Sequence, residues 1–184
     1  MTKVDRALYG GAWFCCVRLL AVTFVVLLLP AYGYADVLTG RVTYVADGDS
    51  FEMRDGFGSF HRVRLRGIDA PEKSQAYANV SRQYLVQLIR GREVTLNFDA
   101  VDKYGRLLAW LHVDDGVSVN LLQVQAGLAW HYPGRYWTAD DDLLARAQAD
   151  ARAAERGLWA RPRPVPPWQY RREHRDDDPR NATR

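Results

Sequence analysis

The sequence predicts an α+β fold of five short strands and about three helices. Two periodicities support this: apolar and polar residues alternate with the strand period of two in five segments, and apolar residues recur at the helix spacing of three to four in three others. The expected strands are 37–45, 50–54, 60–66, 93–98 and 106–113. With 184 residues and 48% hydrophobic content, the chain is large enough for one domain with its own core, plus extensions.

Tight turns join the first three strands. Asp47-Gly48 separates the first two, and Asp55-Gly56-Phe57-Gly58 separates the second from the third. Asp-Gly is a strong hairpin signal because both residues tolerate the backbone angles of a tight turn. The first three strands are therefore expected to form an antiparallel meander, and all five strands are interpreted as antiparallel.

Residues 75–90 change to the helix period, with Gly91 as a C-terminal cap. The tyrosines of this segment are interpreted as facing the core rather than stacking on a substrate. Its expected apolar face consists of Tyr77, Val80, Tyr84, Leu85 and Leu88. A second, shorter helix is expected over residues 119–126, ending at Gly127.

A third helix is expected after Thr138-Ala139-Asp140-Asp141, which resembles a capping box with acids at the positive end of the helix. It is expected to run to Arg156 and stop at Gly157, and Leu158 and Trp159 should pack back on the domain. Its inward positions are expected to be Leu143, Ala147, Ala151 and Ala154.

The domain is expected to span residues 36–160, with an extension at each end. Residues 161–184 are rich in proline and arginine and are interpreted as an extended or disordered tail. That tail is either merely solvated or assists substrate binding.

Residues 1–35 are interpreted as a signal peptide. Three basic residues precede the apolar run 19–29, and small residues stand before Asp36 where cleavage requires them. The run is shorter than the roughly 20 apolar residues of a membrane span, although an uncleaved N-terminal anchor remains the alternative. Cleavage would remove both cysteines and lower the net charge from +3 to about +1. Bulk charge therefore does not indicate a nucleic-acid binder, and phosphate affinity must come from local arginines and a metal ion.

The stretch from Arg62 to Glu72 places three arginines and two acids close together in the sequence R-V-R-L-R-G-I-D-A-P-E. Arginines at alternate positions predict a strand, and Pro71 ends it because proline has no backbone donor. Asp69 and Glu72 then lie at a rigid strand end close to a guanidinium, which suits a divalent cation beside a phosphate. A charged, half-exposed strand edge with solvated arginines is the alternative interpretation.

Two further motifs favour the first interpretation. D-G-D-S at 47–50 and D-K-Y-G-R at 102–106 are both turns, and the second delivers Arg106 to the start of an apolar strand. In this order and at these separations, the three motifs resemble the staphylococcal nuclease family. The resemblance covers residues 37–159 and implies that the five strands close into an OB-type β-barrel with the helices packed on it.

The resemblance also implies the roles of individual residues. Asp49, Asp69 and the backbone carbonyl of Ala70 would bind Ca²⁺, a cation that accepts such oxygen ligands in flexible geometry. Ala70 stands where the best-known member has a threonine, and the loop from Glu72 to the following helix is shorter than in that member. Glu72 matches the carboxylate that positions the attacking water or acts as general base.

Arg64 and Arg106 match the two arginines that contact phosphate, a task suited to a planar guanidinium that remains charged. Lys103, Tyr104 and Tyr132 resemble secondary nucleotide contacts. The four histidines share no metal-binding spacing and are interpreted as ordinary surface or core residues.

Three functions are compatible with these observations. The first is an exported, monomeric, Ca²⁺-dependent nuclease that cuts DNA and RNA and leaves 3′-phosphates and 5′-hydroxyls. The second is a non-catalytic OB-type module that binds nucleic acid or protein. The third is a membrane-anchored form of the first. The convergence of three acids with two arginines favours the enzyme, since a binding module has no use for the acids.

Overall fold

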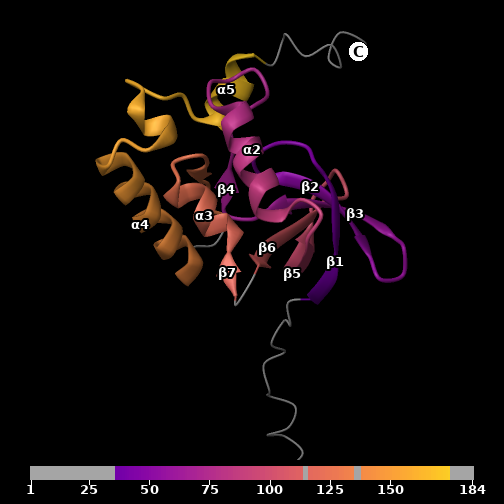
Figure 1. The fold of residues 1–184 in the computed structure, drawn as a ribbon. Coiled ribbons are helices and arrows are strands. Elements are labelled where there is room, and N and C mark those ends of the chain that lie inside the picture. Colours follow the sequence, from indigo (N-terminus) through magenta and orange to yellow (C-terminus); the bar gives the residue numbers. More distant parts are fainter. Residues whose placement is uncertain (1–35, 114–115, 135–137, 175–184) are drawn as a thin grey trace, which may run out of the picture. The chain divides into compact units, whose positions relative to one another are not determined.

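A computed structural model describes residues 36–113, 116–134 and 138–174 (Figure 1). The predicted signal segment 1–35 and the last ten residues of the tail lie outside the described residues. Within the described part, no helix has the length and apolar character needed to cross a membrane.

Five strands close into the predicted barrel. Their order is β3-β2-β1-β5-β6, and β3 pairs with β6 to complete the circle. The strands are β1 (Asp36–Val45), β2 (Ser50–Asp55), β3 (Phe60–Leu65), β5 (Glu93–Val101) and β6 (Leu107–Val113). The four pairs within this order are antiparallel, as predicted, but the closing pair of β3 and β6 is parallel. The reason is geometric, because five strands that alternate in direction must meet a strand of the same direction on closure.

The strands bury alternate residues, so the barrel interior is a packed apolar core. Strand β1 bends at a register shift between Val42 and Tyr44, which lets it pair with β2 along one part and β5 along another. The fully buried strand residues include Phe51, Met53, Val63, Leu65, Leu96 and Leu111.

Helix α2 (Ala78–Ile89) begins three residues later than predicted, because Tyr77 has a left-handed backbone with φ of 67°. The predicted apolar face is partly wrong. Leu85 is buried and Tyr84 is half-buried, but Val80 is exposed. The buried positions are Ala78, Ser81, Leu85 and Ile89, and of these the predicted face included only Leu85.

Helices α3 (Val119–Gln125) and α4 (Ala139–Ala153) lie side by side on one side of the barrel (Figure 1). The capping box of α4 is present, with Asp141 accepting hydrogen bonds from the backbone N–H and the hydroxyl of Thr138. Ala147 and Ala151 face inward as predicted, but Leu144 is buried in place of Leu143, which is 52% exposed, and Ala154 is exposed. A 3₁₀ turn, Gly157–Ala160, then buries Leu158 and Trp159, as predicted.

Short segments complete the fold around the functional motifs. Strand β4 (Ile68–Asp69) pairs antiparallel with β8 (Trp130–His131), and β7 (Val117–Ser118) extends the sheet beside β6. The structure differs from the expected tail, because α5 (Pro167–Glu173) is a helix that begins with a proline. Proline is tolerated there, since the first helical N–H has no intrahelical partner.

Candidate active site

Asp49 is held at the head of β2 by its backbone. Its N–H donates to Asp47 Oδ1 (3.0 Å), and its carbonyl accepts from the N–H of Leu65 (2.8 Å). The preceding Gly48 packs so closely that an added Cβ would lie 1.8 Å from the Ser81 hydroxyl oxygen. The Gly48 carbonyl also accepts a hydrogen bond from Gln123 Nε2 (2.6 Å) on α3. The turn that presents Asp49 is therefore fixed by two helices.

Asp69 comes from the β4 segment that follows the β3 arginines. Its pairing opposite Trp130 fixes the backbone, and its side chain is buried. The next N–H, that of Ala70, donates to Asp49 Oδ2 (2.6 Å), which ties the two acidic motifs directly together. Asp49 and Asp69 thus lie next to each other although they are 20 positions apart in the chain.

Arg64, on β3, bridges the two carboxylates. Its Nη1 donates to Asp49 Oδ1 (2.6 Å) and its Nη2 donates to Asp69 Oδ1 (2.7 Å). The Arg64 side chain is only 19% exposed, so the fork acts in a water-poor site. Burial raises the pKa of Asp49, while the Arg64 guanidinium acts in the opposite direction.

Glu72 follows Pro71 and reaches the edge of this group. Its side chain is 37% exposed, and its carboxylate is joined to that of Asp69 by Arg171 from α5. Arg171 Nη1 donates to Glu72 Oε1 (2.6 Å), and Arg171 Nη2 donates to Asp69 Oδ2 (2.8 Å). The sequence analysis did not single out Arg171.

A pocket of about 450 Å³ opens beside Arg64. It is lined by the second predicted phosphate ligand, Arg106, which Asp102 holds through a hydrogen bond to Nε (2.8 Å). The guanidinium of Arg106 also lies 5.4 Å from the centre of the Tyr104 ring. The remaining predicted nucleotide contacts, Lys103, Tyr104 and Tyr132, line the same pocket.

The structure therefore brings the predicted residues into two adjoining groups. Asp49, Asp69, Ala70 and Glu72 form the acidic group, Arg106 and the three nucleotide contacts surround the pocket, and Arg64 belongs to both. This arrangement can bind an anion against two guanidinium groups with carboxylates close by. In the part of the chain that the structure describes, no three His, Cys, Asp or Glu side chains stand together as a ready metal site.

Comparison with known proteins agrees with this geometry. The family described as "Staphylococcal nuclease homologue" matches residues 62–161, more than half of the chain. The chain belongs to the staphylococcal nuclease family. An uncharacterized endonuclease of Escherichia coli is 43% identical over 132 residues, covering 72% of this chain and 84% of the relative. A micrococcal nuclease of Shigella flexneri is 36% identical over 157 residues, covering 80% and 88%. The protein is a nuclease, a hydrolase of phosphodiester bonds whose substrates are nucleic acids.

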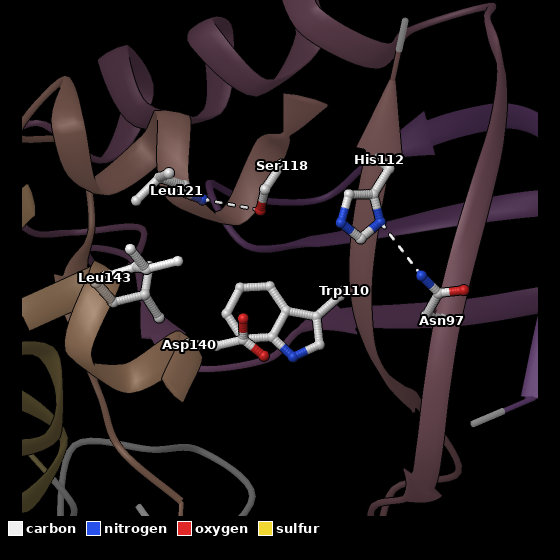
Figure 2. Close-up of a pocket in the computed structure, with 8 residues that line it drawn as sticks. Asn97, Trp110, His112, Ser118, Leu121, Asp140 and Leu143 are labelled. Atoms are coloured by element: carbon white, nitrogen blue, oxygen red, sulfur yellow. Dashed lines mark hydrogen bonds between the residues drawn. The ribbon is translucent and has the colours of Figure 1, made fainter. Parts of the chain in front are cut away.

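A second pocket of about 310 Å³ lies between Trp110 on β6 and Leu143 on α4 of this staphylococcal nuclease homologue (Figure 2), and it shares Trp110 with the pocket beside Arg64. Asp140 and His112 also line it, and the His112 ring contacts the Asn97 amide. None of the predicted site residues lines this pocket. The predicted phosphate and nucleotide contacts line the pocket beside Arg64 instead.

Two buried polar residues on α3 support the nuclease site and were missed by the sequence analysis. Asn120 donates to the carbonyls of Arg66 (2.8 Å) and Ala109 (3.2 Å), joining the turn after β3 to β6. Gln123 binds the Gly48 carbonyl, as described above. The available signal was the presence of amide side chains on an otherwise apolar helix, since buried amides are retained where they satisfy backbone groups.

Proposed function

We propose that this nuclease is exported and Ca²⁺-dependent, and that it cuts both DNA and RNA to leave 3′-phosphates and 5′-hydroxyls. The observation that carries the proposal is the Arg64 fork between two buried carboxylates, at the wall of a pocket that also contains Arg106. Guanidinium groups bind phosphate oxygens, and carboxylates bind a hard cation, so the two groups together suit a phosphodiester.

The donor set fits Ca²⁺. Asp49 and Asp69 are buried and lie next to each other, and carboxylate and carbonyl oxygens are the ligands that Ca²⁺ accepts. We assign Asp49, Asp69 and the Ala70 carbonyl as the groups that would hold the ion. When bound there, Ca²⁺ would neutralise phosphate charge and support the additional charge of the five-coordinate phosphorus.

Arg64 and Arg106 would hold the non-bridging phosphate oxygens. Each guanidinium is fixed before substrate arrives, Arg64 by the two aspartates and Arg106 by Asp102, so little reorganisation is needed. The side chains would retain their charge at any working pH, which a catalytic phosphate clamp requires.

Glu72 would orient the attacking water and accept its proton. Its carboxylate is partly exposed to solvent, and the rigid Pro71 before it limits its movement. Orientation of the water would be its main contribution, since correct placement of a reactant lowers the barrier without requiring a strong base.

Action on both DNA and RNA follows from the contacts available in the pocket. Tyr104 and Tyr132 are 58% and 45% exposed and can stack on any base. Stacking and phosphate binding do not distinguish deoxyribose from ribose, so both polymers should be substrates.

Digestion tests the proposal. Residues 36–184 are incubated with single-stranded DNA, double-stranded DNA and RNA, with Ca²⁺ or with a chelator, and the product ends are analysed. Calcium-dependent cleavage of DNA and RNA that leaves 3′-phosphates is expected. Cleavage that persists in chelator refutes the metal requirement, and cleavage of only one polymer refutes sugar nonspecificity.

Export is proposed from the signal-like residues 1–35 and is tested separately. The N-terminal residue of the protein recovered from an expressing bacterium should be Asp36, in the periplasm or the medium. Recovery of the intact N-terminus in the membrane fraction would support the anchored form instead.

We also propose that the protein is a monomer, and light scattering of the purified protein tests this.

A further inference from the structure

Several contacts with other parts of the chain hold helix α5 and the residues just before it over the acidic group. It lies next to the N-terminal end of α2 (Figure 1), where Gln75 donates to the Val165 carbonyl (3.1 Å). The Tyr170 hydroxyl donates to the Ser74 hydroxyl (2.9 Å). These two contacts join residues 90 and 96 positions apart in the sequence, so this part of the tail is docked on the folded domain.

Two aromatic contacts hold the start of the same helix in place. Trp168 lies 5.7 Å from the ring of Trp130 and 5.2 Å from that of Tyr132, measured between ring centres. Trp130 pairs opposite Asp69, and Tyr132 lines the pocket beside Arg64. Helix α5 thus packs on residues 130–132, a segment that pairs with Asp69 and lines the pocket.

These contacts place Arg171 on the carboxylates. Its guanidinium donates to both oxygens of Asp69 (3.1 and 2.8 Å) and to Glu72 Oε1 (2.6 Å). Arg64 also donates to Asp69 Oδ1. Both oxygens of Asp69 therefore accept hydrogen bonds from guanidinium groups, and a cation that binds this carboxylate competes with two positive charges already paired with it.

Arg171 is the more readily displaced of the two. Its side chain is 43% exposed, against 19% for Arg64, and it belongs to a helix of seven residues at the edge of the fold. Arg64 belongs to β3, which is paired with β2 on one side and β6 on the other, and it contacts a second buried carboxylate. Competition for Asp69 should therefore release Arg171 and leave Arg64 in place.

We propose that Arg171 is an intramolecular competitor of the metal ion, and that α5 is an autoinhibitory clasp released when Ca²⁺ binds. The guanidinium compensates the charge of Asp69 and Glu72 in the metal-free enzyme and occupies the space that the ion and the attacking water need. This inference rests on the Ca²⁺ dependence proposed above. It adds that the C-terminal helix sets the metal concentration at which the nuclease becomes active.

Direct metal binding tests the proposal without relying on activity. Calorimetry of Ca²⁺ binding compares the wild-type chain 36–184 with Arg171→Ala and with the matched control Arg172→Ala. Arg172 is exposed and forms no ion pair with any residue that the structure describes, so the control removes the same charge from the same helix. We expect Arg171→Ala to bind Ca²⁺ about 3- to 30-fold more tightly than the wild type and Arg172→Ala to change affinity less than about 2-fold.

Hydrogen exchange of the unmodified chain supplies a second measurement that does not depend on a variant. Saturating Ca²⁺ should accelerate exchange of the α5 amides of Tyr170 and His174, which are bonded within the helix, while core amides of β6 stay protected. Slower or unchanged exchange in α5 would overturn the clasp.

The outcomes separate this inference from the proposed function. Equal or weaker Ca²⁺ binding by Arg171→Ala, with normal binding by the wild type, overturns the competitor role and leaves the Ca²⁺-dependent nuclease standing. If neither the wild type nor Arg171→Ala binds Ca²⁺, the proposed metal requirement is refuted and the inference with it.

Discussion

Replacing Arg64 by glutamine removes the guanidinium that contacts both Asp49 and Asp69. The Arg64 side chain is 19% exposed, and the two carboxylate side chains are 2% and 1% exposed. Breaking an ion pair at this depth costs about 3–5 kcal/mol, because a buried charge is left without compensation. Since Arg171 still contacts Asp69, we expect the lower end, about 3 kcal/mol of unfolding free energy.

Urea unfolding of residues 36–184 in chelator at pH 7 measures this loss. The matched control is Arg66→Gln, two residues along the chain, whose partner Asp99 is 48% exposed. An exposed pair contributes about 0–1 kcal/mol, so the control should be nearly neutral. Equal losses in the two variants, or a loss below about 1 kcal/mol for Arg64→Gln, would refute the reasoning that burial makes the Arg64 fork essential to the fold.

Arg64→Lys separates stability from catalysis at the same position. Lysine retains the charge but lacks the fork that spans the two aspartates, so part of the stability should return. The turnover of DNA should nevertheless remain about 10²- to 10³-fold below that of the wild type, because the paired phosphate contact is lost.

Three further changes test other parts of the site. Glu72→Gln should retain the fold and Ca²⁺ binding but lose most turnover, and unchanged kcat in a DNA digestion assay would remove Glu72 from the mechanism. Gly48→Ala should destabilise the protein by more than about 2 kcal/mol in urea unfolding, because the new methyl group overlaps the Ser81 hydroxyl; a neutral result would show that the turn can move. Burial alone would raise the pKa of Asp141, but hydrogen bonds from His131 and Thr138 outweigh it and lower that pKa. A lowered pKa contributes stability above the ordinary value near 3.9 that is lost as the pH falls through the folded value, so Asp141→Asn should cost about 1–2 kcal/mol at pH 7 and progressively less below about pH 4. Unfolding curves at both pH values check this, and a cost independent of pH would exclude the carboxylate charge as its source.

The strands were predictable because their signals are local. Alternation in β2 and β3 and the Asp-Gly turns gave bounds within one residue of those observed. The parallel closure between β3 and β6 is not local, since it depends on the number of strands in the circle. Periodicity indicates how many strands there are but not that they close into a barrel. The family resemblance indicated the closure.

The helix faces were less predictable, because neighbours decide which face is buried. Leu143 and Leu144 are equally apolar, yet only Leu144 is turned inward, beside Gly67. Similarly, Ser81 faces the core of the fold because Gly48 leaves space there for a small side chain only. Such choices follow from tertiary packing and carry no signal within the helix itself.

The residues of the acidic group are likewise brought together partly by contacts that are local in the sequence and partly by distant ones. Ser50 lies opposite Arg64 in the β2–β3 hairpin, so the turn at residues 55–59 already determines that Asp49 and Arg64 meet. Asp69 joins them through the pairing of β4 with β8, and β8 begins 61 positions after Asp69 in the chain. Arg171 is more distant still, at 102 positions from Asp69, within a segment whose composition indicates a solvated tail. A contact of this kind is encoded by the docking of Trp168 and Tyr170 on a surface that exists only after the barrel has folded. The contact between Asp49 and Arg64 therefore follows from a local hairpin, whereas the positions of Asp69 and Arg171 depend on strand pairing and helix docking in the completed fold.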